Sequence, residues 1–266
     1  MIKLQGSSNE NFVVLGLGRS GMTSARALNA SGANVICWDD DPEKRSLASS
    51  QGLRVIGSVS DFDWESIDRL IISPGVPHHF PSPHPIVSAA VSAGVLIDND
   101  VGLFFQSIAT ESWEKFSVRP RIVAVTGSNG KSTTASLLHH IFLKRGYKSQ
   151  LAGNIGRGVL DIDPPENNEL IVLELSSYQT EVARMLSPDL AIFTNFSADH
   201  LERHGGIGGY LAAKRRLFTE GCPDYSIIGV DELAGLNLAQ QLSASIGDES
   251  IIRVSAKNQI RGFDWS

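Results

Sequence analysis

The residues best suited to chemistry form a glycine-rich turn near the middle of the chain. Its sequence, TGSNGKST, lies between an apolar run at residues 122–125 and an amphipathic stretch that continues to about Arg145. In such a strand–turn–helix unit, backbone N–H groups hold phosphate oxygens, a lysine reaches the β- and γ-phosphates, and a hydroxyl can bind Mg²⁺. The turn is shorter than the standard GxxxxGK[ST] loop, because Val125 stands where that loop has its first glycine. We predict that eight residues bind ATP: Thr126, Gly127, Ser128, Asn129, Gly130, Lys131, Ser132 and Thr133.

Further polar residues follow two later strand candidates. Glu174 comes directly after the apolar run 170–173, and the sequence TNFSADH occupies residues 194–200. A carboxylate beside the phosphate-binding turn supplies the hard oxygen that Mg²⁺ prefers. The structural alternative for Glu174 is an acid that caps the following turn. Taken alone, His200 is typical of a loop histidine and Lys214 of a solvated charge on a helix face.

A second glycine-rich turn lies near the N-terminus. The sequence GLGRSG, residues 16–21, fits GxGxxG between a strand and a helix candidate, and Asp39 and Asp40 end the next strand. The pattern indicates a dinucleotide site, but any nucleotide diphosphate would satisfy the same backbone N–H groups and helix N-terminus. A tight turn that binds nothing is the alternative. Gly75 follows the strand candidate 69–72, at the end of the strand where open α/β sheets bind ligands.

The histidines and cysteines give no metal or disulfide signature. His78, His79 and His84 lie in a proline-rich stretch in which nothing fixes ligand geometry, so solvated loop histidines are the favoured interpretation. Cys37 and Cys222 are far apart and show no CxxC spacing. We therefore expect two free thiols and a reducing compartment.

The composition is that of an ordinary globular protein. Of the 266 residues, 42% are hydrophobic and 20% charged, and the formal net charge is −6, so no global positive field attracts nucleic acid or an anionic membrane. The N-terminus lacks the apolar core of a signal peptide, and no run of about 18 apolar residues occurs. We expect a soluble cytoplasmic protein without nucleic-acid or membrane partners.

Short β-branched runs alternate with helix-like stretches along the whole chain, which is typical of α/β folds with mostly parallel sheets and helices on both faces. The strand candidates of the first unit are residues 12–15, 34–38, 69–72 and 95–97, and its helix candidates are 21–30, 42–51 and 85–93. Those of the second unit are strands at 122–125, 170–173, 190–193, 226–230 and 251–254. Mixed charge and a proline place the linker at 107–121. The tail, residues 256–266, carries no signal for a closing helix.

Taken together, these motifs resemble the Mur ligase family. The shared motifs occur in the family's order and at similar spacing: TGSNGKST at 126–133, GNIG at 153–156, ELSSYQ at 174–179, NFSADH at 195–200 with LERH after it, and AAK at 212–214. The form ELSSYQ and the N-terminal GLGxxG turn are similar to the D-glutamate-adding branch. The resemblance covers nearly the whole chain. It implies a Rossmann-like UDP-substrate-binding domain at residues 1–118, followed by a P-loop-type ATP-binding domain at residues 119–266.

The resemblance also implies roles for individual residues. The family's catalytic positions correspond to Lys131, Glu174, His200 and Lys214. Contacts with the acceptor, UDP-N-acetylmuramoyl-L-alanine, are implied for Gly18, Arg19, Ser20, Asp39, Gly75, Asn154, Ser176 and His200. Two Mg²⁺ ions are implied, one near Ser132 and Glu174 and one near His200 and Lys214. Lys214 matches a lysine that the family carries as a carbamate, a modification in which CO₂ converts an amine into an anionic oxygen donor.

The implied reaction is phosphoryl transfer followed by amide formation in peptidoglycan precursor synthesis. The γ-phosphoryl group of ATP passes to the alanyl carboxylate, and the amine of D-glutamate then attacks the acyl phosphate. Lys131 and Mg²⁺ would neutralise the repulsion between the two anions that meet in the first step. We expect a monomer.

One departure from the family is large, because its C-terminal domain and its later adenine-contacting motifs are absent. We therefore expect the second domain to be truncated and the 266-residue chain to be inactive alone. Three alternatives remain: a nicotinamide-dependent oxidoreductase based on residues 16–21 and Asp39, a folate-polyglutamylating ligase of the same superfamily, and a non-catalytic nucleotide-binding module. The oxidoreductase leaves the second glycine-rich turn without a purpose. The folate enzyme should lack the separate N-terminal domain.

Overall fold

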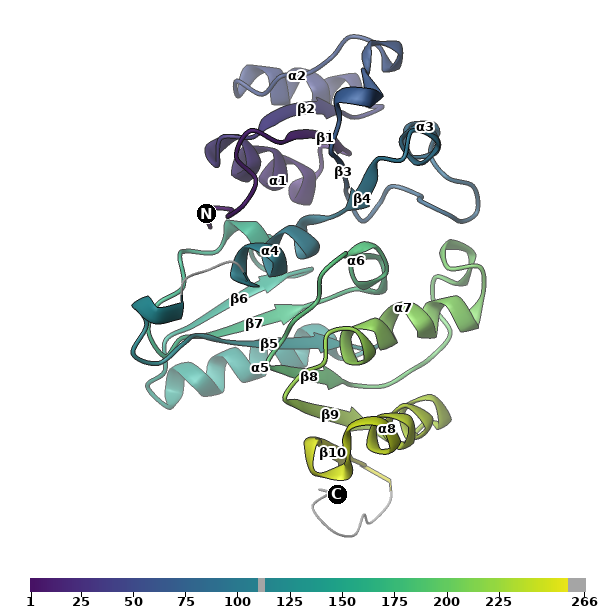
Figure 1. The fold of residues 1–266 in the computed structure, drawn as a ribbon. Helices are drawn as coiled ribbons and strands as arrows, with labels where there is room; N and C mark the ends of the chain where they lie inside the picture. Colours follow the sequence, from purple (N-terminus) through teal and green to yellow (C-terminus); the bar gives the residue numbers. More distant parts are fainter. Residues whose placement is uncertain (110–112, 258–266) are drawn as a thin grey trace. The chain divides into compact units, whose positions relative to one another are not determined.

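The computed structural model describes residues 1–109 and 113–257 (Figure 1). The contacts between residues divide the chain into two compact units. Unit 1 comprises Met1–Glu111, Gly158–Pro164 and Val182–Met185, and unit 2 comprises Ser112–Arg157, Pro165–Glu181 and Leu186–Ser266. Two short segments from the second half of the chain therefore belong to unit 1. The domain limits 1–118 and 119–266 stay a prediction.

Unit 1 contains a four-stranded parallel sheet in the order β2-β1-β3-β4. Its strands are β1 (Asn11–Leu15), β2 (Asn34–Trp38), β3 (Arg69–Ile72) and β4 (Leu96–Asp98). Its helices are α1 (Arg19–Ala30), α2 (Pro42–Ser50), α3 (Pro85–Ser92) and α4 (Asp100–Ala109). Each inner strand is apolar after its first residue, as expected for parallel strands covered on both faces. Proline at the first helical position begins α2 and α3, where it costs no hydrogen bond.

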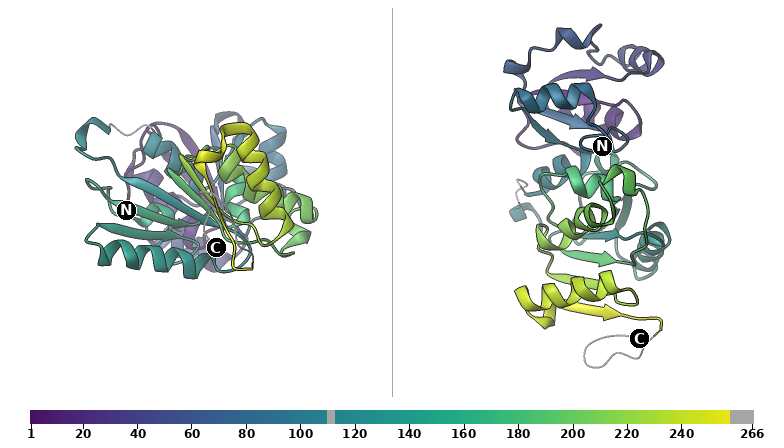
Figure 2. Two further views of the ribbon diagram at one scale, coloured as in Figure 1. Left: turned by 90° about the horizontal axis from the view of Figure 1, so that it is seen from below. Right: turned by 90° about the vertical axis from the view of Figure 1, so that its right-hand side faces the viewer.

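Unit 2 contains a six-stranded parallel sheet in the order β10-β9-β8-β5-β7-β6. Its strands are β5 (Arg121–Thr126), β6 (Ser149–Gly153), β7 (Leu170–Glu174), β8 (Leu190–Phe193), β9 (Tyr225–Gly229) and β10 (Ile251–Val254). Its helices are α5 (Lys131–Lys144), α6 (Ser177–Val182), α7 (Ile207–Thr219) and α8 (Leu233–Ile246). Helix α5 packs on β5, β6 and β7, and α8 lies on the other side of the sheet (Figure 2, left).

The predicted fold class is confirmed, and both sheets are entirely parallel. Strands β2, β3, β8 and β10 have the predicted bounds. The other predicted strands differ by one residue, at one end in β1 and β7 and at both ends in β4, β5 and β9. Strand β6 was not predicted, because its sequence SQLAG lacks an apolar run. It lies at the edge of the sheet, where a strand does not need to be apolar along its length. The predicted linker at 107–121 overlaps the end of α4 and includes residues outside the described part. Most of the tail for which no closing helix was predicted also lies outside it.

Within the described residues, no helix is both long and apolar enough to cross a bilayer. The buried core of unit 2 on the α5 side of the sheet consists of aliphatic residues from α5 and three strands: Val123, Val125, Ala135, Val172 and Ile192. Residues directly beyond the carboxyl ends of these strands are thus held on a rigid base.

Candidate functional site

The segments of unit 2 that carry the residues predicted to bind ATP and Mg²⁺ lie at the carboxyl edge of its sheet. Strand β5 leads into the phosphate-type turn, and β7 ends at Glu174. Strand β8 ends at Phe193, directly before Thr194. Because β5 lies between β7 and β8, the three segments that follow these strands are neighbours. This edge is where open α/β sheets bind ligands.

The turn after β5 has the backbone that its glycines predict. Gly127 has φ of 140° and Gly130 has φ of 77°, both in the region that favours glycine. A Cβ on Gly127 would lie 2.0 Å from Oγ1 of Thr194, so no larger residue fits without movement. The N–H group of Asn129 donates to Oδ1 of Asn195 at 2.9 Å. The segment after β8 therefore holds the turn in place, and α5 begins with Lys131 directly after it.

Ser132 and Glu174 form a pair of hard oxygen ligands beside this turn. Oγ of Ser132 donates to Oε2 of Glu174 at 2.9 Å, and Glu174 is 1% exposed. Mg²⁺ is commonly bound by one or two protein oxygens, with substrate phosphates and water completing the shell. The described residues contain no group of three or more His, Cys, Asp or Glu side chains that could bind a metal by themselves. The pair fits a magnesium ion that is shared with a phosphate.

Lys214 is buried, so the interpretation of this residue as a solvated helix-face charge is wrong. It lies on α7, is 1% exposed, and its Nζ donates to the carbonyl oxygen of Gly127 at 2.6 Å. Burial, followed by the nearby charge of Lys131, lowers the pKa of Lys214 to about 7. A large fraction of this amine is therefore neutral near pH 7, the form that can react with CO₂.

A small pocket of about 130 Å³ is lined by five of the predicted site residues of unit 2. Its lining is Lys131, Asn154, Ser176, Ser177, Tyr178, Asp199, His200, Tyr210 and Lys214. Sequence reasoning singled out five of these and missed Ser177, Tyr178, Asp199 and Tyr210. The first three lie inside quoted motifs, so their positions could have been found. Tyr210 precedes Lys214 by four residues on α7, a spacing that places both on one helix face.

His200 stands at the entrance of this pocket in a left-handed conformation. Its φ is 50°, its side chain is 49% exposed, and its Nε2 lies 3.4 Å from Oδ2 of Asp199. Its ring centroid is 5.2 Å from that of Tyr178. An exposed imidazole beside a carboxylate is available to a ligand that enters the pocket.

The first glycine-rich turn lines a separate pocket of about 480 Å³ within unit 1. The lining includes all five of the predicted acceptor-binding residues in this unit: Gly18, Arg19, Ser20, Asp39 and Gly75. Gly18 precedes α1, and a Cβ added to it would meet open space. A Cβ on Gly21 would lie 1.7 Å from the carbonyl oxygen of Gly16. The two glycines therefore differ: Gly21 is needed for packing, whereas Gly18 leaves room in the pocket.

Asp39 already holds the first turn together. Its Oδ2 accepts a hydrogen bond from the N–H group of Leu17 at 2.6 Å, and its Oδ1 accepts one from the N–H group of Asp41 at 2.9 Å. In a nicotinamide-binding protein, the acid at this position receives the hydroxyl groups of a ribose. The carboxylate thus has a structural use that is independent of any dinucleotide.

His84 caps a helix at the rim of the same pocket. Its Nδ1 accepts from the N–H group of Ile86 at 3.2 Å, and its Nε2 lies 3.0 Å from Oδ2 of Asp40. The hydrogen bond from His84 is the largest cause of the lowered pKa of Asp40. Both ring nitrogens of His84 are therefore engaged within the protein.

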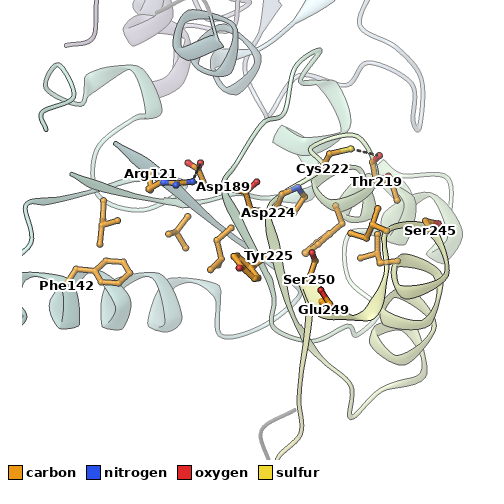
Figure 3. A pocket seen from close by; sticks show the side chains of 17 residues that line it. Arg121, Phe142, Asp189, Thr219, Cys222, Asp224, Tyr225, Ser245, Glu249 and Ser250 are labelled. Atoms are coloured by element: carbon orange, nitrogen blue, oxygen red, sulfur yellow. Dashed lines mark hydrogen bonds and ion pairs between the residues drawn. The ribbon is translucent and has the colours of Figure 1, made fainter. Parts of the chain in front are cut away.

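A larger pocket of about 960 Å³ lies at the opposite edge of the unit 2 sheet (Figure 3). It is lined by residues at the beginnings of strands, including Arg121, Asp189 and Tyr225, with Phe142 of α5. Arg121 bonds to Asp189 at 3.0 Å and to Asp224 at 3.1 Å. None of the predicted site residues lines this pocket, so this hollow and the predicted site residues of unit 2 lie at opposite ends of the strands.

Comparisons with known proteins agree with this geometry. Residues 125–265 match the Mur ligase middle domain, and residues 10–98 match the MurD-like N-terminal domain of Mur ligases. The chain is 55% identical over 266 residues to the UDP-N-acetylmuramoylalanine–D-glutamate ligase of Cereibacter sphaeroides strain KD131. It is 57% identical over 267 residues to the ligase of the same name from Roseobacter denitrificans. In both comparisons all of this chain is covered, and it spans 57% of the length of the relative.

A solved structure supports the fold. The UDP-N-acetylmuramoyl-L-alanyl-D-glutamate–2,6-diaminopimelate ligase superposes with a TM-score of 0.53 at 19% identity. The match covers 96% of this chain and 47% of the other. At this identity the likeness concerns the fold alone.

Proposed function

Since the chain belongs to the Mur ligase family, we propose that it forms the nucleotide-binding part of an ATP-dependent ligase that joins D-glutamate to UDP-N-acetylmuramoyl-L-alanine. The observation that carries the proposal is the small pocket of unit 2. There Lys131, Lys214 and His200 surround one space beside the Ser132–Glu174 pair. The similarity to D-glutamate ligases over the whole chain supports the choice of substrates.

In this proposal, residues 126–133 hold the phosphates of ATP. The turn offers backbone N–H groups at the start of α5, where the helix dipole favours negative charge. Lys131 currently bonds to the carbonyl oxygen of Ser128 at 2.8 Å and would turn to the transferred phosphoryl group. Its charge would reduce the repulsion between that group and the alanyl carboxylate. Asn154 and Ser176 would contact the acceptor from the pocket wall.

We propose that the site binds two Mg²⁺ ions. Ser132 and Glu174 would hold one, and His200 with a carbamylated Lys214 would hold the other. When bound, the ions would neutralise charge on the phosphoryl group and the carboxylate. The lowered pKa of Lys214 supports the carbamate, because a protonated amine would not react with CO₂.

Unit 1 would hold the UDP portion of the acceptor. Gly18, Arg19 and Ser20 face its pocket at the start of α1, where a diphosphate could accept from backbone N–H groups. Asp39 and Gly75 would lie near the uridine. We propose that residues 1–118 and 119–266 are the two domains, and that the protein works as a monomer in the cytoplasm on peptidoglycan precursors.

The test is phosphate release by the full-length gene product. With ATP, Mg²⁺ and UDP-N-acetylmuramoyl-L-alanine present, release of phosphate should depend on added D-glutamate and should match the amount of amide formed. Omission of the acceptor should abolish it. Release that is indifferent to D-glutamate, or hydride transfer to a nicotinamide cofactor instead, would contradict the proposal.

A further inference from the structure

A serine, a histidine and a carboxylate form a row behind the small pocket of unit 2. His204 follows the short turn η5 (Leu201–Arg203), and its side chain is fully buried. Its Nε2 lies 2.9 Å from Oγ of Ser177, and its Nδ1 lies 2.8 Å from Oε2 of Glu181. Ser177 and Glu181 lie four residues apart on α6, so they share a helix face. Because Ser177 lines the pocket, the row leads inward from its wall.

The two partners of His204 determine which ring nitrogen carries the proton. An ionised carboxylate can only accept, so the position of Glu181 favours the tautomer of a neutral ring with its hydrogen on Nδ1. Nε2 then has a lone pair that accepts the hydroxyl proton of Ser177. The contact with Glu181 is close, although its angle falls short of hydrogen-bond geometry. Such contacts often align only when substrate binds. Ser177 is left with an oxygen lone pair that can accept a proton from the pocket.

The surroundings of His204 keep the ring fixed. Tyr178 stacks on it with ring centroids 5.2 Å apart and planes 13° apart, and the ring of Tyr210 is 5.3 Å away. Charged groups near the row include Arg203, whose guanidinium lies 5.0 Å over Tyr178, and Arg216, which donates to the carbonyl oxygen of Glu181. The carboxylates of Glu202 and Asp199 also act on Tyr178 through their charge. A buried, oriented imidazole between a hydroxyl and a carboxylate is the arrangement that activates serine hydroxyls in enzymes.

We propose that Ser177, His204 and Glu181 form a proton relay that serves the amide-forming step. The inference rests on the proposed ligase function and assigns the base that this step needs. Ser177 touches the pocket and would contact the attacking amine, while His204 and Glu181 act through it.

The neutral amine attacks the carbonyl carbon of the acyl phosphate, and the C–N bond forms. The surplus proton on nitrogen passes to Oγ of Ser177 while the hydroxyl proton of Ser177 passes to Nε2 of His204. The bond between that carbon and the phosphate oxygen breaks, and its electron pair leaves with phosphate. Glu181 stabilises the resulting imidazolium, which returns its proton to solvent when the product leaves.

A second serine–histidine pair in unit 2 supplies a matched control. Nδ1 of His139, on α5, lies 2.9 Å from Oγ of Ser149, on β6. Neither residue lines the small pocket. Replacement of His139 by glutamine therefore removes an equivalent contact without touching the proposed relay.

The main test separates the two chemical steps in the full-length gene product. Hydroxylamine traps the acyl phosphate as a hydroxamate when D-glutamate is withheld, and amide formation is measured when it is supplied. His204→Gln and Glu181→Gln should form hydroxamate within about twofold of the parent rate, while amide formation falls by roughly 100-fold, a typical contribution of a general base. His139→Gln should match the parent in both. An equal fall in both steps, or unchanged amide formation, would overturn the relay. Absence of hydroxamate with the parent protein would instead refute the ligase function.

A second measurement needs neither activity nor a stable variant. In the ¹⁵N spectrum of imidazole nitrogens of the 266-residue chain, neutral His204 should carry its proton on Nδ1. A neutral ring protonated on Nε2 would overturn the relay, because Ser177 could not then pass its proton to that nitrogen.

Discussion

The two glycine-rich turns of this chain share a backbone plan and differ in their side chains. Each connects a parallel strand to a helix at the carboxyl edge of a sheet, and each places glycine directly before the helix. Around the first turn, Arg19 and Lys44 line the pocket together with the carboxylates Asp39 and Asp40, and Lys44 lies 3.6 Å from Asp39. Around the second, Lys131 and the buried Lys214 line one small space.

Two turns with the same backbone plan can therefore serve different chemistry, because the side chains around them differ. Backbone N–H groups and a helix N-terminus are sufficient to hold a diphosphate. Transfer of a phosphoryl group also requires side-chain cations that neutralise charge as it develops. On this account, unit 1 binds and unit 2 reacts, and each prediction below alters one side of the contrast.

The largest effect is expected from Lys131→Ala in the full-length gene product. Loss of this cation should lower kcat by roughly 1,000-fold or more, because it stabilises the transferred phosphoryl group. Affinity for the acceptor should change little, since unit 1 is untouched. Lys144→Ala, at the exposed end of the same helix, is the control. Steady-state phosphate release at saturating ATP is the measurement, and a near-normal rate would refute the role of the turn.

Lys214→Ala should be the next most severe change. The variant removes the carbamate oxygens that the proposal assigns to this residue, so activity should fall by about 100-fold or more. Short carboxylic acids added to the assay should partly restore it by supplying anionic oxygens. Mass spectrometry or electron density of the liganded protein that shows an unmodified amine would return Lys214 to a structural role.

Gly18→Val should separate folding from binding in unit 1. A Cβ at this position meets open space, so the circular dichroism spectrum should be unchanged. The branched side chain would fill the space in which the diphosphate lies, and affinity for the UDP acceptor should fall by more than about tenfold, or over ~1.4 kcal/mol. Gly21→Ala should instead destabilise the fold, because its Cβ would lie 1.7 Å from the Gly16 carbonyl oxygen. Unchanged acceptor affinity in folded Gly18→Val would remove the first turn from the site.

The smallest effect concerns Asp98 of unit 1, which lies outside both pockets. Burial raises the pKa of Asp98 to about 6, against a value of 3.8 for a free side chain. The folded state therefore favours the protonated acid, and this group should cost stability as pH rises from about 4 to 6. Asp98→Asn keeps the oxygen that accepts from the N–H groups of Asn99 and Arg184.

The Asp98→Asn variant should consequently gain stability relative to the parent chain as the pH is raised. The difference in unfolding free energy between the two should shift by about 2 kcal/mol from pH 4 to pH 7, and then stay level. Urea unfolding of both chains at several pH values measures this shift. A difference that is constant with pH would show that folding leaves the pKa of Asp98 unchanged.

The sequence predicted the strands and turns well because both are determined locally. An apolar run favours a buried strand, and a glycine permits the backbone of a tight turn. It did not predict β6 or the burial of Lys214. The first is an edge strand without an apolar run, and the second depends on how α7 packs against the phosphate-type turn. The row of Ser177, His204 and Glu181 was also missed. It joins residues from two segments, and their proximity follows from tertiary packing, which residue spacing does not reveal.

The measurement that tests the account most directly is calorimetric titration of the 266-residue chain with UDP-N-acetylmuramoyl-L-alanine, with NADH as the control. The account predicts saturable binding of the acceptor at one site and no binding of NADH. Tight binding of NADH without binding of the acceptor would contradict it, because the first turn would then serve a nicotinamide cofactor.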